Sequence, residues 1–147
     1  MEERENLRLR PLQEEDAKEL FSLTSDERVS RFMRFETHTT LEQAQELIRD
    51  YERGLAFAVE RERIFIGVFA LKPGESEKEY SISAFFSPES WGRGYATEVL
   101  HRGIEFAREM LAAKRLKAYV VEENGGSRRV LEKNQFSVKK KIPFSEG

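Results

Sequence analysis

A glycine-containing junction between a strand-like run and a helix-like run constrains this chain more than any other feature. It reads SPESWGRGYATEVL, from Ser87 to Leu100. The preceding run, EYSISAFF, has the residue types of a strand, and the following run repeats apolar residues at i, i+3 and i+4 for about four turns. Because glycine lacks a Cβ, such a junction lets a phosphate approach the backbone, and the first N–H groups of the helix point at it. The junction therefore predicts an anion site at the start of the longest helix.

Two familiar phosphate motifs do not fit this junction. The Walker pattern requires Gly-Lys-Ser/Thr, which is absent, and the dinucleotide fingerprint requires a third glycine where Thr97 stands. A simpler interpretation stays open, in which the glycines only turn the chain into the helix. The two interpretations differ in whether the junction binds a ligand.

The runs around the junction predict one α/β domain over residues 1–147 with a central mixed sheet. We expect strands at 7–10, 55–62, 64–72, 79–86, 116–121 and 136–144, with a tight hairpin around Arg61 to Arg63. We expect helices at 14–24, 40–51, 96–111 and 127–134, and an irregular stretch from Arg28 to His38. The order β-α-α-β-β-β-α-β-α-β predicts helices on both faces of the sheet and parallel strands across the junction.

Composition argues against several classes of function. Twenty-five Lys and Arg against 27 Asp and Glu give a net charge of -2, so no global basic field attracts nucleic acid or an anionic membrane. The absence of cysteine excludes disulfides and thiolate sites, and the two histidines, His38 and His101, lack a carboxylate pair at ligand spacing, so we expect no metal. The longest apolar run, IFIGVFAL, is far below the ~20 residues of a membrane helix, and we expect a cytoplasmic protein.

Three segments together resemble one family of enzymes. SPESWGRGYATEVL is similar to the acetyl-CoA pyrophosphate loop of the GNAT acetyltransferases, especially the branch that acetylates ribosomal-protein N-termini, where P-x-x-W-G-x-G-Y-A-T-E is typical. NGGSRRVLEKNQF, from Asn124 to Phe136, resembles the N-x-x-S-x-x-x-L-E-K-x-G-F segment of that branch, and LRLRPLQEEDA fits its N-terminal pattern. The resemblance runs from about Leu7 to Phe136 and implies the GNAT fold with acetyl-CoA as co-substrate.

The resemblance implies a cofactor site built mainly from backbone. On one strand, the main chain of Phe85 and Phe86 would pair with the pantetheine arm. The pyrophosphate would be wrapped by the backbone of the loop residues Trp91, Gly92, Arg93, Gly94, Tyr95, Ala96 and Thr97. On the neighbouring strand, Asn124 would hydrogen-bond the arm. The two strands splay apart in this family, which opens a slot for the cofactor. The side chain of Arg93 is a further candidate for a phosphate contact.

The groups that move protons depart from the usual pattern. The tyrosine acid of many superfamily members corresponds to Leu131, and in the ribosomal-protein branch a serine at the position of Ser127 is the proposed substitute. Ser127 is equally suited to cap its helix. The usual glutamate of the branch corresponds to Ser81, and Glu79, on the same face of the strand, is the candidate base; the alternative is a solvated surface carboxylate.

The acceptor is expected to be a primary amine. The family builds its acceptor groove between the first two helices, where Arg28, Phe32 and Met33 fall, with Phe35 beside them. A weak base suits an α-amino group, whose pKa is about 7.7–8.0, better than a lysine near 10.4. We therefore expect direct attack by a protein N-terminus on acetyl-CoA in a ternary complex. A small amine acceptor (polyamine, amino acid or antibiotic) and a non-catalytic acyl-CoA-binding module are the alternatives.

The C-terminal segment bears on assembly. Relatives usually carry one more strand after the strand that ends near Phe144, and this chain stops at Gly147. The exposed edge would be blunted by Lys139, Lys140 and Lys141, or would pair with a second molecule as a homodimer.

Overall fold

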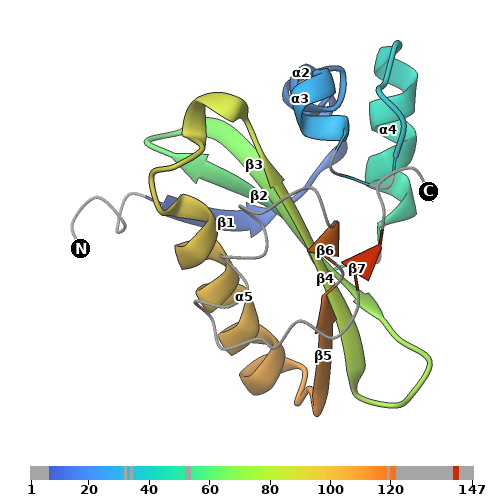
Figure 1. Cartoon of the computed structure of the whole chain (residues 1–147), viewed down its shortest axis with the longest axis vertical. Coiled ribbons are helices and arrows are strands. Elements are labelled where there is room, and N and C mark those ends of the chain that lie inside the picture. Colours follow the sequence, from blue (N-terminus) through green and yellow to red (C-terminus); the bar gives the residue numbers. More distant parts are fainter. Residues whose placement is uncertain are drawn as a thin grey trace.

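The computed structural model describes residues 7–31, 33, 35–51, 54–118, 120–121 and 141–142 (Figure 1). Its main element is a five-stranded sheet with the order β1-β2-β3-β4-β5, in which every neighbouring pair is antiparallel except the parallel pair β4–β5. The strands are β1 (Leu7–Pro11), β2 (Ala56–Arg61), β3 (Ile64–Pro73), β4 (Glu79–Phe86) and β5 (Arg115–Ala118). Two further short strands, β6 (Val120–Val121) and β7 (Lys141–Ile142), pair in parallel with each other.

Helices cover both faces of this sheet, as the sequence predicted (Figure 1). The long helix α5 (Tyr95–Met110) lies on one face, and α2 (Ala17–Thr24), α3 (Glu27–Ser30) and α4 (Leu41–Asp50) lie on the other. Each face has its own apolar cluster. Phe69 and Val99 are central to the cluster under α5, whereas Leu20 and Val68 belong to the cluster under α2 and α4. Full burial of one such side chain contributes about 1.5–3 kcal/mol, so the two clusters fix both helical layers on the sheet.

The β2–β3 connection is a two-residue turn, which confirms the predicted tight hairpin. Glu62 and Arg63 both adopt positive φ, 51° and 71°. Two consecutive left-handed residues form the type I′ geometry, whose twist matches that of the flanking strands. Neither residue is a glycine, so the turn follows from the pairing of the strands rather than from a turn motif in the sequence.

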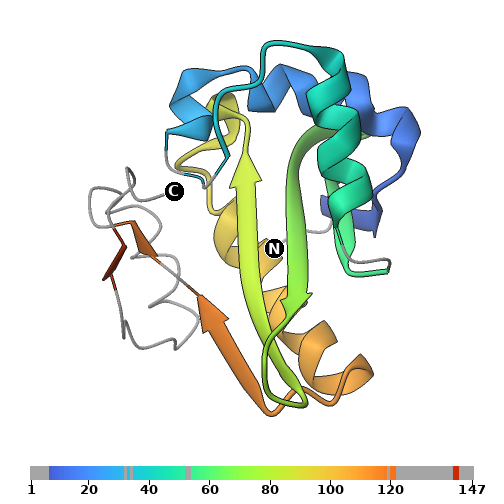
Figure 2. The same cartoon turned by 90° about the vertical axis from the view of Figure 1, so that its right-hand side faces the viewer.

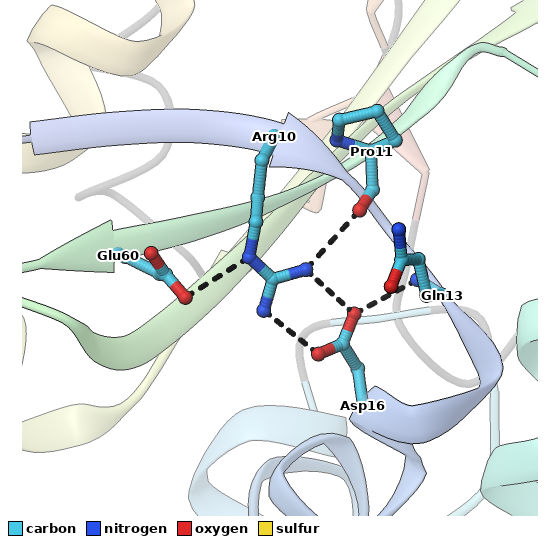
Figure 3. A network of polar contacts seen from close by, with 5 residues as sticks. All are labelled: Arg10, Pro11, Gln13, Asp16 and Glu60. Carbon is cyan, nitrogen blue, oxygen red and sulfur yellow. Dashed lines mark hydrogen bonds and ion pairs between the residues drawn. The ribbon is translucent and has the colours of Figure 1, made fainter.

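Arg10 of β1 joins the edge of the sheet to the start of the helical layer (Figure 3). Its guanidinium donates to both carboxylate oxygens of Asp16, at 2.8 and 3.0 Å, and to Glu60 of β2 at 3.0 Å. Asp16 also accepts from the Gln13 N–H at 2.8 Å and so caps the 3-10 turn η1 (Glu14–Asp16). The hydrogen bonds to Asp16 raise the pKa of Arg10 despite its partial burial. Bidentate arginine–carboxylate pairs are among the stronger hydrogen-bonded contacts, so this one fixes where α2 begins.

Two segments differ from the sequence-based expectation. The stretch after Arg28 was expected to be irregular, but α3 reaches Ser30 because Asp26 caps it, accepting from the Arg28 N–H at 2.9 Å. The single strand predicted at 116–121 is two strands, because the chain leaves β4 after Ala118 and pairs Val120 with Lys141. The predicted helix at 127–134 and most of the strand at 136–144 lie outside the described residues.

Within the described ranges, no helix is both long enough and apolar enough to cross a membrane.

Candidate active site

The described part of β4 has an open edge at its C-terminal half. β5 pairs with β4 only from Glu79 to Ile82. β5 ends at Ala118, opposite Ile82, and Figure 2 shows β5 leaning away from β4 toward β6, which lies apart from β4, so the two sides form a V. The splay that the family resemblance implied is therefore present, and residues 83–86 of β4 lie at its open side.

The backbone groups that face this opening follow from the pairing with β3. The Ser87 N–H donates to the Ile66 carbonyl at 2.8 Å, so the pair Ile66–Ser87 is a hydrogen-bonded one. In an antiparallel ladder such pairs alternate, and the residues between them direct their N–H and C=O groups to the other side. Ala84 and Phe86 therefore present their main-chain groups to the opening, where a peptide-like ligand can add as a strand. Phe85, between them, directs its main-chain groups toward β3, so the main-chain contact predicted for Phe85 would fall to Ala84 instead.

The glycine loop joins the end of this edge to α5. The 3-10 turn η2 (Pro88–Ser90) follows β4, and Gly92 and Gly94 then adopt φ of 78° and 84°. Gly94 is the N-cap of α5, and the helical ladder starts with the Glu98 N–H donating to the Gly94 carbonyl at 3.2 Å. The N–H groups of residues 95–97 precede that ladder. Together with the positive end of the helix dipole, they form a potential site for an anion.

The surroundings of the loop fit a pyrophosphate. A Cβ placed on Gly92 would have no atom within 4 Å, so this part of the loop has open space beside its backbone. The side chain of Tyr95 is buried in the α5 cluster, with the Arg61 guanidinium 5.5 Å from its ring centroid, which holds the first turn of the helix in place. Arg93 is exposed and lines a hollow of about 360 Å³ together with Arg61 and Ile66. The predicted loop residues 91–97 are thus contiguous at the end of the open edge.

Trp91 makes a contact that the sequence did not indicate. Its indole Nε1–H donates to the Phe86 carbonyl at 3.0 Å, although the residue is 46% exposed. The bond links the first residue of the loop to the last residue of β4. A side chain-to-backbone bond of this kind has no sequence signal beyond the presence of a donor.

On the opposite face, β4 meets the predicted acceptor segment. Phe85 packs in the cluster under α2 and α4, which Met33 and Phe35 join from the loop after α3. The rings of Phe35 and Phe85 meet edge to face with centroids 5.4 Å apart, and the centroid of the His38 ring also lies 5.4 Å from that of Phe35. Ser83, two residues before Phe85 on the same face, is exposed. The structure thus brings Met33 close to the open half of β4, whereas Phe32 lies outside the described residues.

His38 was expected to have no role, yet it is part of this aromatic group. Its backbone N–H donates to the Thr24 carbonyl at 3.0 Å. Among the residues that the structure describes, no hydrogen-bond partner reaches its buried Nδ1, and burial lowers the pKa of the ring. His38 is therefore held mainly as the neutral imidazole at neutral pH.

Arg28 lies at the border between α3 and the glycine loop. Its side chain donates to both oxygens of Asp26, at 2.7 and 3.1 Å, and stands 3.9 Å from Glu89 of η2. Hydrogen bonding to Asp26 raises the pKa of Arg28, and the same bonds lower the pKa of Asp26. Arg28 thus keeps its charge at an exposed position near the loop.

Glu79 is not the solvated carboxylate that was one of the two expectations for it. Its residue is only 5% exposed, and its Oε1 accepts from the Ser76 N–H at 3.3 Å in the turn between β3 and β4. Its main-chain carbonyl also accepts from the Gly74 N–H at 2.6 Å. Glu79 begins β4, roughly 23 Å along the strand from Phe86 at 3.3 Å per residue. The candidates Asn124 and Ser127 lie outside the described residues.

The residues that the structure describes contain no group of three or more His, Cys, Asp or Glu side chains that could hold a metal ion.

Comparison with known proteins decides the family of this site. A family model described as an acetyltransferase (GNAT) domain matches residues 6–137. The chain belongs to the GNAT acetyltransferase family. This acetyltransferase is 28% identical over 145 residues to an uncharacterized N-acetyltransferase, YoaA, of Bacillus subtilis, with 91% of this chain and 81% of YoaA covered.

Solved structures show the same fold. A GNAT-family acetyltransferase from Bacillus anthracis matches with a TM-score of 0.79 and 26% identity, over 88% of this chain and 78% of the other. Spermidine N-acetyltransferase from Vibrio cholerae, solved in complex with CoA and spermine, matches with a TM-score of 0.82 and 20% identity, over 92% and 83%. The GNAT fold binds acetyl-CoA, and the open edge and glycine loop of this N-acetyltransferase have the groups to do so.

Proposed function

We propose that this acetyltransferase transfers the acetyl group of acetyl-CoA to the α-amino group of a protein N-terminus, by direct attack in a ternary complex. The observation that carries the proposal is the lack of a free carboxylate on the β4 face that meets the acceptor segment. That face presents Glu79, Ser81, Ser83 and Phe85, and Glu79 is buried in the β3–β4 turn. An α-amino group is partly neutral at neutral pH and needs less help from a base than a lysine does.

The chain's own groups would hold the co-substrate in two places. The N–H groups at the start of α5, with Gly92 leaving room for close approach, would bind the pyrophosphate. The outward main-chain groups of Ala84 and Phe86 would pair with the amide-bearing arm. When bound, acetyl-CoA supplies an acetyl thioester that a neutral amine can attack. The V between β4 and β5 would orient that thioester toward the side of Phe35 and Phe85.

The groups that would take up and donate protons are part of the same proposal. Neutral His38, part of the acceptor-side aromatic group, is a candidate to receive a proton from the incoming ammonium, directly or through water. Ser127, as the acid for the departing thiolate, and Glu79, as a base, stay predictions. The position of Glu79 in the β3–β4 turn favours a structural role for it, because its Oε1 already accepts a hydrogen bond there.

Apolar and cationic groups on the acceptor side support a peptide acceptor. Met33, Phe35 and Phe85 would bury the first side chain of the peptide, and exposed Arg28 would favour a nearby acidic residue. A polyamine carries several positive charges and would pair with carboxylates; exposed Glu36 beside Phe35 and exposed Glu89 near Arg28 keep a polyamine as the second candidate acceptor. Asp26, the carboxylate nearest to Arg28, is already hydrogen-bonded to it.

Three acceptors test the proposal. A short peptide with a free N-terminus, the same peptide blocked at the α-amine but containing lysine, and spermidine would each be incubated with acetyl-CoA, with thiol release measured between pH 6 and 9. The free N-terminus should react fastest, with kcat/KM rising through the α-amino pKa of about 7.7–8.0. Faster turnover of spermidine than of the free peptide would assign a small-amine acceptor instead.

A further inference from the structure

A charged pair lies in the first two turns of α5, next to the candidate anion site. Of the residues Tyr95 to Glu98, which form the first turn, Glu98 alone is charged. Arg102, one turn further, donates from its Nε to the Glu98 Oε2 at 2.9 Å. The side chains are only 22% exposed for Glu98 and 33% for Arg102, so salt screens this pair less than a pair on an open surface.

Arg102 is also bonded to the edge of the sheet. A second nitrogen of its guanidinium donates to the Leu7 carbonyl of β1 at 2.8 Å. The Leu12 N–H donates to the Ala56 carbonyl at 3.0 Å, and hydrogen-bonded pairs alternate along an antiparallel ladder, so Leu7 directs its carbonyl away from β2. No strand that the structure describes pairs with this outer side of β1. The edge carbonyl is thus available to Arg102, and it fixes the guanidinium beside Glu98.

The bond to Arg102 draws the Glu98 carboxylate along the helix, away from the N-terminus of α5. In a helix each Cα–Cβ bond tilts toward the N-terminus, so a free glutamate near the start lies toward the unpaired N–H groups. The N–H groups of residues 95–97 are those that would bind the pyrophosphate. A free Glu98 would therefore offer them an anion of the protein's own and repel the incoming one.

We infer that Arg102 is a positioning residue for the anion site, because its pairing with Glu98 keeps that carboxylate from opposing the pyrophosphate of acetyl-CoA; this rests on the proposed function. Glu98 is four residues from Gly94, roughly 6 Å along the helix axis. This distance is within the Debye length of about 10 Å at 0.1 M salt, so a charge at Glu98 affects an anion at the site. The pair together is close to neutral, whereas either member alone would change the potential there.

The first test separates charge from structure by the direction of the effects. CoA, which cannot transfer an acetyl group, is the probe, and isothermal titration at low ionic strength measures its Kd. Arg102→Met frees Glu98 and should raise the Kd about twofold to fivefold, whereas Glu98→Gln leaves an uncompensated cation and should lower the Kd by a similar factor. The double variant should bind CoA nearly as the wild-type protein does. If E98Q binds CoA no more tightly than the wild type, or R102M no more weakly, the inference is wrong.

A matched control and the ionic strength add two further readouts. Glu105→Gln makes the same change of charge in the same helix, where Glu105 contacts His101 at 3.4 Å, but it lies seven residues further along, about 10 Å. E105Q should change the Kd less than E98Q; equal effects would assign the change to the net charge of the protein and overturn the local role. Added salt should bring the single variants closer to the wild type. Differences that salt does not reduce would point to altered structure and against the inference.

Stability provides an effect of opposite sign. A carboxylate in the first turn stabilises a helix through its dipole, so E98Q should have a lower Tm without ligand although it binds CoA more tightly. A lower Tm together with weaker binding in E98Q would show a structural role alone, and the inference would fail. If the wild-type protein does not bind CoA at all, the proposed function itself is wrong, which is a different outcome from a wild type that binds CoA and an E98Q variant that binds it no more tightly.

Discussion

Gly103 of α5 lies directly on the ring of Phe69 in β3. A Cβ placed on Gly103 would overlap Phe69, and both residues are buried in the cluster that joins α5 to the sheet. The absence of a side chain at Gly103 therefore sets how closely the helix approaches the strands. Because the glycine loop leads into α5, this contact also sets the height of the candidate anion site above the sheet.

Gly103→Ala should destabilise the protein although alanine favours helices. Replacing glycine by alanine in a helix gains about 1 kcal/mol of helix propensity. Overpacking a core contact costs about 1–3 kcal/mol, so the net effect is a loss of up to about 2 kcal/mol. Chemical denaturation would measure the free energy of unfolding. Phe69→Leu in the G103A background should recover part of the loss, whereas exposed Met110→Ala should change stability by less than about 0.5 kcal/mol. A fully stable G103A would show that the helix and Phe69 are not in tight contact.

Gly92→Asn should weaken CoA binding by about tenfold or more. Asparagine tolerates positive φ, but its side chain would fill the open space beside the loop and cost at least one charge-assisted hydrogen bond. Isothermal titration with CoA measures the effect. Gly54→Asn is a matched control, since Gly54 has φ of 81° against 78° for Gly92 and likewise no atom within 4 Å of an added Cβ. Equal affinities in the two variants would refute the account of the loop.

Arg10→Met should reduce stability by about 2–4 kcal/mol. The substitution leaves Asp16 and Glu60, which are largely buried, without their shared cation, and removing one partner of a buried ion pair costs several kcal/mol. Thermal unfolding would measure the loss. The triple variant R10M/D16N/E60Q should be more stable than R10M, because no charge is then left without its partner. A triple variant no more stable than R10M would indicate that lost packing dominates.

His38 should make the protein less stable below about pH 6.5. Burial lowers the pKa of His38 from its ordinary 6.5, so between that value and the lower folded one the unfolded state binds more protons. The free energy of unfolding therefore has its full value above pH 6.5, where His38 is neutral in both states, and it decreases as the pH falls through this window. The ring is flanked by Phe35, and no described residue offers its Nδ1 a partner that would stabilise a proton. His38→Gln should show a flatter free energy of unfolding between pH 5 and 6.5; identical pH profiles would contradict this assignment.

Local patterns predicted the main elements well. The strands β1 to β4 and the long helix after the glycines were predicted from apolar runs, alternation and the 3.6-residue period, and the parallel return to β5 from the order of the elements. The helix α3 was missed because it spans only Glu27–Ser30, too few residues to show a period, and depends on the Asp26 cap.

The order of the elements and the position of the glycine loop follow from the sequence, because period and backbone freedom are properties of neighbouring residues. The surroundings of these elements follow from the fold. Three features depend on where a separate segment is placed: the end of the β4–β5 pairing at Ile82, the burial of Glu79 and the bond from Trp91 to Phe86. Such contacts join residues through space, and no pattern within either segment encodes them.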